Sequence, residues 1–141
     1  MSSKAVRSLL IVDDDPGDAL IAKHYLEKSG RYEHVLTASD GREALQLWEN
    51  HETSRQEHGG AFPPLIVLLD INMPRMNGFE FLEALAELPQ PEVTASFVVM
   101  VTSSEHGPDV ERASIFPRVK DYLVKPFTLQ HAIDLADRFG S

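Results

Sequence analysis

The chain alternates short apolar runs with longer segments in which apolar residues recur at helical spacing. Short runs rich in branched side chains are typical of buried strands, and a recurrence every three or four residues is typical of helices that cover a core with one face. The predicted strands span residues 7–12, 33–37, 65–70, 96–101 and 119–124. The predicted helices begin near residues 16, 41, 79, 107 and 129. A strand followed by a helix therefore occurs five times.

This order of elements predicts an α/β fold with three layers. Each connection is long enough to hold a helix, which favours parallel pairing, so five helices should cover both faces of a five-stranded parallel sheet. We expect a single domain over residues 7–139, with short tails at 1–6 and 140–141. Residues 49–64 are polar and contain Gly59-Gly60 and Pro63-Pro64. We interpret them as an irregular surface insertion before the central strand.

Composition narrows the functional classes. The chain has 141 residues, of which 43% are hydrophobic and 25% charged, as in ordinary globular proteins. It has no cysteine, which excludes disulfides and thiolate chemistry. Its formal net charge of −9 disfavours nucleic-acid and anionic-membrane binding. With no long apolar run and no signal-peptide pattern, we expect a cytoplasmic protein.

Four of the predicted strands end in polar residues suited to one reaction: Asp13 and Asp14, Asp70, Thr102, and Lys125. The carboxyl ends of parallel strands lie at one edge of the sheet, where ligands bind. Three carboxylates gathered there would repel one another, and Mg²⁺ is the hard cation that suits such oxygen ligands. The lysine and the threonine hydroxyl would stabilise a transferring phosphoryl group. Asp70 is then the predicted nucleophile, forming an aspartyl phosphate.

Four separated motifs, in order IVDDD, LLDINMPRMNGFEFL, MVTSS and DYLVKPF, carry a resemblance to a known family. The sequence resembles the receiver domain of two-component response regulators, in the manner of the chemotaxis regulators. The resemblance covers nearly the whole chain. It implies a flavodoxin-like sheet with strand order 2-1-3-4-5.

The resemblance also implies residue roles. Asp13 and Asp14 would hold Mg²⁺ together with Asp70 and the backbone carbonyl of Asn72, while Asp70 accepts phosphate from a sensor histidine kinase or a phosphotransfer protein. Thr102 and Lys125 would contact the phosphoryl oxygens. Tyr122 would change position together with Thr102. The side chains of Asn72 and Ser104 would tune the phosphate lifetime. The Lys125-Pro126 bond would be a cis peptide.

The implied function is a stand-alone switch without enzymatic turnover beyond slow autodephosphorylation. Its signal would appear on the face built from the helix over 107–116, the strand over 119–124 and the last helix, and mixed charges there would permit a homodimer. Those charged residues are Arg112, Lys120, Asp121, Asp134 and Arg138. The opening Asp15-Pro16-Gly17-Asp18 and the insertion resemble the regulators that partner bacterial phytochromes. The Phe116-Pro117-Arg118-Val119 turn departs from the family, which has small residues there.

Other interpretations of these residues stay open at this stage. Taken singly, Asp70, Thr102 and Lys125 could be solvated strand ends, Asp15 a helix cap, and Tyr122 a packing residue. A Mg²⁺-dependent phosphatase with an aspartyl intermediate is a second function, although Asn72 stands where haloacid-dehalogenase-like enzymes need a second Asp. A receiver-like domain that binds partners without phosphate is a third. The six histidines show no metal-ligand spacing.

Overall fold

A computed structural model describes residues 5–88, 96–103 and 107–140. The strands are β1 (Val6–Val12), β2 (Tyr32–Ala38), β3 (Ile66–Asp70), β4 (Phe97–Thr102) and β5 (Val119–Val124). The helices are α1 (Pro16–Ser29), α2 (Gly41–Glu49), α3 (His51–His58), α4 (Gly78–Ala86), α5 (Gly107–Ser114) and α6 (Leu129–Phe139), with a 3₁₀ turn η1 (Gly59–Ala61).

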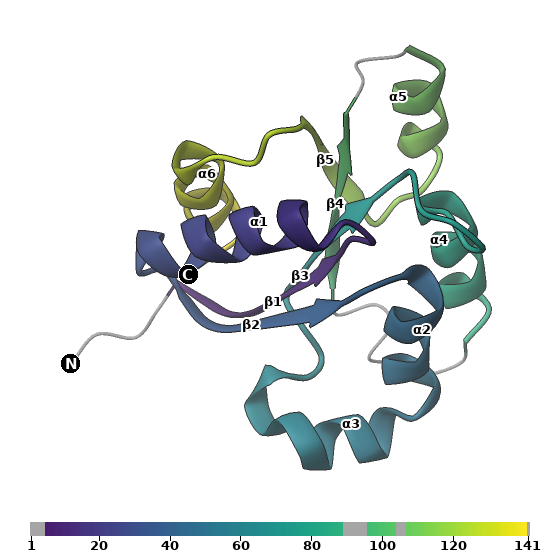
Figure 1. The fold of residues 1–141 in the computed structure, drawn as a ribbon. Coiled ribbons are helices and arrows are strands. Elements are labelled where there is room, and N and C mark those ends of the chain that lie inside the picture. Colours follow the sequence, from purple (N-terminus) through teal and green to yellow (C-terminus); the bar gives the residue numbers. More distant parts are fainter. Residues whose placement is uncertain (1–4, 89–95, 104–106, 141) are drawn as a thin grey trace.

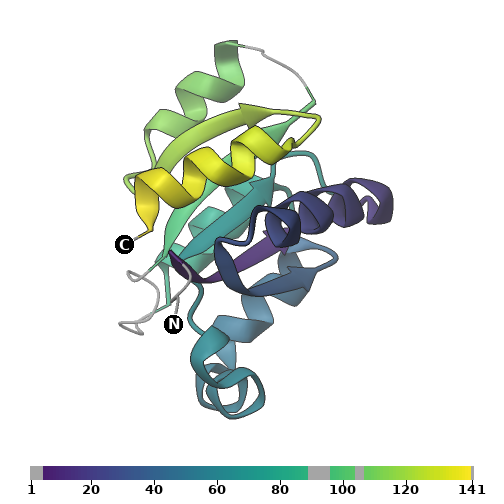
Figure 2. The same ribbon diagram turned by 90° about the vertical axis from the view of Figure 1, so that its left-hand side faces the viewer.

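All strand pairs are parallel, and the strands lie in the order β2-β1-β3-β4-β5. This confirms the predicted flavodoxin-like fold. Helices cover both faces of the sheet, with α1 and α6 side by side on one face and α2 and α4 on the other (Figures 1 and 2). The described part of the chain holds six α-helices, one more than predicted. None of these helices has the length and apolarity needed to cross a bilayer.

The central strands are buried on both faces because their side chains alternate between two apolar clusters. On β1, Leu10 and Val12 face the cluster under α2 and α4, whereas Leu9 and Ile11 face the cluster under α1 and α6. Strands β3 and β4 alternate in the same way. Continuous apolar runs are the expected sequence signature of such strands. The burial of both faces fixes the register, so the polar residues that end these strands have fixed positions.

The helices begin where the sequence supplies caps. Asp15 accepts hydrogen bonds from the backbone N–H groups of Gly17 and Asp18, and Asp40 and Thr128 cap α2 and α6 in the same way. These three caps were predicted from their residue types and neighbours. Each of these caps lies two to four residues after a strand end, so these three helices start at the edge of the sheet where the polar residues gather.

The insertion is more ordered than predicted. Residues 49–64 were expected to be an irregular loop, but α3 and η1 lie within them, and α3 is the additional helix (Figure 1). Its sequence, HETSRQEH, holds no apolar residue, so it shows no hydrophobic periodicity, although Glu, Gln and Arg favour helix. The Ser54 hydroxyl donates to the Leu47 carbonyl at 2.7 Å, and Arg7 donates to the Gly60 carbonyl at 2.9 Å.

The aromatic side chain that follows η1 anchors the insertion to the core. Phe62 is buried and packs edge-to-face on Trp48, which is fully buried in α2, with ring centroids 5.5 Å apart. Trp48 also packs on Phe81 of α4 at 6.0 Å. The insertion is therefore fastened to the sheet and to α2, on the face opposite α1 and α6.

We predict that Phe62→Ala lowers the free energy of unfolding by about 3 kcal/mol, because it removes a buried aromatic ring and leaves a cavity beside Trp48. Urea denaturation followed by the fluorescence of Trp48, the single tryptophan, measures this change. The matched control is Leu20→Ala, since Leu20 is 68% exposed. Equal effects of the two substitutions would contradict the proposed anchor.

Candidate functional site

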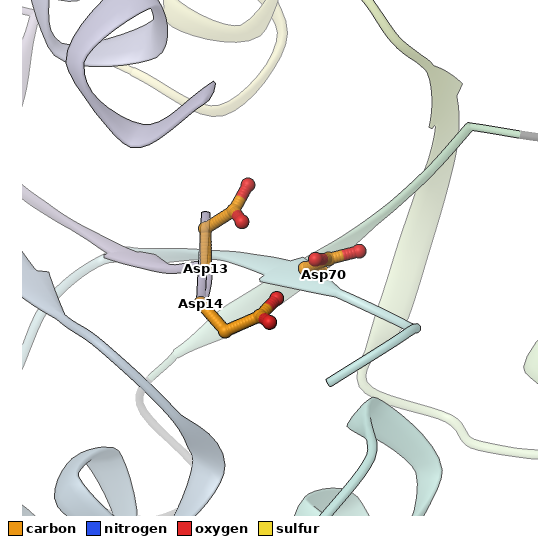
Figure 3. A group of neighbouring side chains, drawn as sticks. All are labelled: Asp13, Asp14 and Asp70. Atoms are coloured by element: carbon orange, nitrogen blue, oxygen red, sulfur yellow. The ribbon is translucent and has the colours of Figure 1, made fainter. Parts of the chain in front are cut away.

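Three carboxylates meet at the carboxyl edge of the sheet, as predicted. Asp13 and Asp14 directly follow β1, and Asp70 is the last residue of β3, the strand beside it. One carboxylate oxygen of each lies within 4.8 Å of the other two (Figure 3). Asp13 and Asp70 are only 8% and 4% exposed, whereas Asp14 is exposed. The group therefore combines two buried acids with one that faces solvent.

Backbone groups orient the two buried acids. The Asp13 carboxylate accepts a hydrogen bond from the N–H of Asp15 at 2.9 Å. The Asp70 carboxylate accepts one from the N–H of Asn72 at 3.2 Å. Both donors lie two residues after their acceptors. The chain therefore turns directly after each strand end, and the N–H group in the turn binds the carboxylate.

Lys125 supplies the positive charge at this edge. Its ammonium lies 3.1 Å from Asp13, 3.5 Å from Asp70 and 2.8 Å from Asp18, and its side chain is 17% exposed. Its backbone N–H donates to the Thr102 carbonyl at 2.7 Å, which ties the end of β5 to the end of β4. The following Lys125-Pro126 bond is cis, as the resemblance implied.

Thr102 and Tyr122 occupy one face of the sheet. Thr102 ends β4, is fully buried and is in register with Val124, while Tyr122 is in register with Met100. Residues two apart on a strand share a face, so Thr102 and Tyr122 lie on the side of Met100. Tyr122 is half-buried and packs against the cluster that includes α4 and α5 residues.

Of the two residues expected to tune phosphate lifetime, one can be placed. Asn72 is exposed at the edge, two residues after Asp70. Ser104 lies outside the described residues. The loop that carries Asn72 closes tightly, because a Cβ added at Gly78 would lie 2.8 Å from the Asp70 carbonyl oxygen. Only glycine fits at that position without displacing the backbone.

Comparison with known proteins identifies this arrangement. Residues 9–137 match the family profile described as the response regulator receiver domain. The protein belongs to this family. The match includes the carboxyl ends of all five strands, and so each strand end that carries a predicted site residue.

Proteins similar to this receiver domain align with it over nearly its whole length. The chain is 28% identical to the chemotaxis protein CheY of Thermotoga maritima, over 94% of this chain and 96% of that protein. A two-component response regulator from Cytophaga hutchinsonii has a similar structure, with a TM-score of 0.82, 27% identity and coverage of 97% and 98% of the two chains. The bacteriophytochrome response regulator AtBRR is similar as well, with a TM-score of 0.73, 30% identity and coverage of 94% and 91%.

The electrostatics of the receiver domain reflect the crowding of its acids. Burial and the neighbouring Asp13 carboxylate raise the pKa of Asp70 to about 7, although the Lys125 ammonium and the Asn72 N–H act in the opposite direction. Burial lowers the pKa of Lys125, but hydrogen bonds to Asp18 and Asp13 outweigh burial and hold it above its usual value. Lys125 therefore remains an ammonium at neutral pH, while the Asp70 carboxyl keeps its proton to a higher pH than an ordinary aspartate does.

The donor set of the receiver domain fits a hard divalent cation. All three acids offer oxygen ligands, and Asp14 leaves the group open to solvent. Receiver domains bind Mg²⁺ at an acidic cluster of this kind. Mg²⁺ keeps several waters and needs only a few protein carboxylates, which agrees with this partly exposed group.

Asp18 is the site residue that sequence reasoning missed. It was noted only as part of the opening of α1, yet it makes the shortest contact with the Lys125 ammonium. Its sequence signal is its place in the first turn of a helix that starts at the functional edge, three residues after the capping Asp15. That signal is weak, because an acid in the first turn of a helix is common for electrostatic reasons alone.

We predict that Asp70→Asn stabilises the metal-free receiver domain at pH 8 but not at pH 4. Folded Asp70 keeps its proton up to about pH 7, whereas in the unfolded chain its carboxyl has the ordinary aspartate pKa of 3.8 and ionises earlier. The free energy of unfolding therefore falls between about pH 4 and pH 7 and stays low above it, and the variant lacks this loss. The expected gain at pH 8 is about 1 to 4 kcal/mol.

Urea denaturation with a chelator present, repeated across this pH range, measures the difference between the two proteins. Titration of the Asp70 carboxyl carbon by NMR gives an independent value for its pKa. A stability difference that stays the same at pH 4 and pH 8 would contradict the buried, proton-retaining Asp70.

Proposed function

We propose that this receiver domain accepts a phosphoryl group on Asp70 in a Mg²⁺-dependent reaction and passes the signal to partners through a changed surface. The observation that carries the proposal is the position of the Asp70 carboxylate, which lies among the acids of β1 with the Lys125 ammonium 3.5 Å away. A buried carboxylate with a fixed ammonium beside it, in a group of acids that suits a divalent cation, is the arrangement expected of a phosphoryl-accepting nucleophile.

The transfer forms one bond and breaks one. An oxygen of Asp70 attacks phosphorus, and the bond from phosphorus to the phosphohistidine nitrogen of the donor breaks. The electron pair of that bond goes to the imidazole, which takes up a proton from solvent. Asp70 must be ionised to attack, and a divalent cation bound beside it would favour the ionised carboxylate over the protonated form.

Four groups would hold the metal: the carboxylates of Asp13, Asp14 and Asp70, and the carbonyl of Asn72. When bound, Mg²⁺ would offset the negative charge on the transferring phosphoryl oxygens. Lys125 would donate to one of these oxygens and the Thr102 hydroxyl to another. Since Thr102 shares its sheet face with Tyr122, movement of the threonine toward the phosphoryl group would open space for the tyrosine.

Receiver domains interact with histidine kinases or phosphotransfer proteins. We propose a sensor histidine kinase as the donor, and similarity to AtBRR and RtBRR, both named as bacteriophytochrome response regulators, supports a phytochrome as that kinase. RtBRR has a TM-score of 0.74 and is 27% identical to this chain.

The phosphatase alternative lacks support at the residue where it needs an acid. Two residues after Asp70 stands Asn72, an exposed amide that cannot give up or take a proton in catalysis. The receiver family is a signalling switch and generally not an enzyme. We therefore favour a switch whose only turnover is slow loss of its own phosphate.

We predict that incubation with acetyl phosphate and Mg²⁺ adds one phosphate to the protein, detected by intact-mass measurement. The gain should disappear in Asp70→Asn, and it should fall at least tenfold when a chelator removes Mg²⁺. Asp134→Asn is the matched control, because Asp134 is an exposed carboxylate on α6 that should not affect the reaction.

Three outcomes would overturn this proposal. A wild-type protein that gains no phosphate would support a receiver-like domain that binds partners without phosphorylation. A gain that persists in Asp70→Asn would place the modification elsewhere. Turnover of an added phosphoester would favour the phosphatase.

The face formed by α5, β5 and α6 is the proposed output surface. Arg138 donates to Asp121 and to the Lys120 carbonyl, both at 2.8 Å, so β5 and α6 are joined by charged groups at the surface. The Arg138 and Asp121 side chains are 53% and 32% exposed and remain accessible to a partner. A second copy could exchange these ion pairs across a symmetric interface.

We predict that a phosphoryl analogue, beryllofluoride with Mg²⁺, shifts the protein from monomer toward dimer in a concentration series measured by light scattering. Arg138→Ala should weaken this dimer about tenfold, because it removes the guanidinium that would pair with Asp121 of a second copy. Arg31→Ala is the matched control, since Arg31 pairs with Asp137 away from β5. A monomer at every concentration, with and without the analogue, would contradict the dimer.

A further inference from the structure

The Lys125 ammonium is shared among three carboxylates, and its nearest partner lies outside the acidic group. The distance from its nitrogen is 2.8 Å to Asp18, 3.1 Å to Asp13 and 3.5 Å to Asp70. An ammonium has three donors, so these three acids can use all of them. Asp70, the proposed phosphoryl acceptor, has the longest of the three contacts.

Asp18 is held in place by the start of α1. Its backbone N–H donates to the capping Asp15 at 3.2 Å, and Pro16 opens the helix one residue after that cap. The first turn thus directs Asp18 toward the end of β5. The small cavity at this point has a volume of about 20 Å³ and is lined by Asp18 and Lys125 and by apolar side chains such as Ile21 and Phe127. There is room for about one water molecule, so most of the space around the ammonium is taken by carboxylates and apolar side chains.

Exposure distinguishes Asp18 from the other two partners. Its side chain is 40% exposed, whereas those of Asp13 and Asp70 are 8% and 5% exposed. A carboxylate that leaves an ammonium loses least when water can replace the lost contact. When a phosphoryl oxygen on Asp70 requires a donor from Lys125, the contact with Asp18 is therefore the one that can be given up.

We propose that Asp18 is a positioning residue, which holds the Lys125 ammonium away from Asp70 in the resting protein and competes for it with the phosphoryl group. This inference rests on the proposed function. It makes Asp18 a determinant of how strongly the phosphorylated state is stabilised. The tie between α1 and the end of β5 would also loosen when Lys125 changes partner.

Beryllofluoride at saturating Mg²⁺ tests the competition, with the bound analogue detected by ¹⁹F NMR. Asp18→Asn should bind it about fivefold more tightly than wild type, because Lys125 no longer has a competing acceptor. Asp15→Asn is the matched control: it removes one negative charge from the same helix turn, keeps a capping side chain and makes no contact with Lys125 in the described structure. It should change the affinity less than twofold.

Two further variants separate positioning from general structure. Asp18→Glu keeps a carboxylate and should restore affinity near the wild-type value. In a Lys125→Gln background, Asp18→Asn should have no effect beyond that of Asp15→Asn, because the residue through which Asp18 acts is gone. A fivefold effect that persists in this background would overturn the proposal, as would equal effects of Asp18→Asn and Asp15→Asn.

A separate measurement tests Asp18 even if the proposed function fails. Wild-type protein that binds no beryllofluoride would refute the phosphoryl site, but Mg²⁺ affinity by calorimetry would still report on Lys125. Asp18→Asn should weaken Mg²⁺ binding about threefold more than Asp15→Asn does, because the released ammonium moves onto Asp13 and Asp70 and competes with the cation. Equal Mg²⁺ affinities of the two variants would overturn the role of Asp18.

Discussion

Repulsion among carboxylates at one edge of the sheet is the constraint on which the site depends. Asp13 and Asp70 are buried within a few ångströms of each other, and Asp14 and Asp18 lie beside them, yet Lys125 is the one cation within 4 Å of this group among the described residues. Burying like charges is unfavourable unless a cation or a proton compensates them. In the metal-free protein, burial and the neighbouring Asp13 carboxylate together raise the pKa of Asp70. A cation bound among these acids would offset both effects.

The fold makes this crowding unavoidable. Strands β1 and β3 are neighbours and buried on both faces, so neither strand can slide or turn to separate the acids that follow Val12 and Leu69. The tight approach of Gly78 to the Asp70 carbonyl fixes the loop on the other side. The stability of the apolar core therefore keeps these like charges close together. A cationic ligand can reduce their repulsion.

Much of the fold and of the site could be predicted from the sequence, because the gathering of the site residues follows from the parallel pairing of the strands. Once the five strands are assigned, Asp13, Asp70 and Lys125 must share an edge, whatever the details of packing. Two features could not be found in this way. Helix α3 has no apolar residue, and periodicity therefore could not reveal it; its order comes from Ser54 and from the anchor at Phe62. The contact of Asp18 with Lys125 depends on the direction of one helix turn, which no local pattern specifies.

Lys125, which offsets the negative charge of these acids, also links the two faces of the sheet. Thr102 and Tyr122 lie on the side of α4 and α5, whereas Asp18 belongs to α1 on the opposite side, and Lys125 touches Asp18 with its side chain and Thr102 with its backbone. The proposed phosphoryl group on Asp70 would add negative charge where three carboxylates already share one ammonium. Even with a divalent cation bound, some existing contact must then weaken, and the most exposed one is on α1. A change of charge on Asp70 should therefore reach both helical layers and not the α5-β5-α6 face alone.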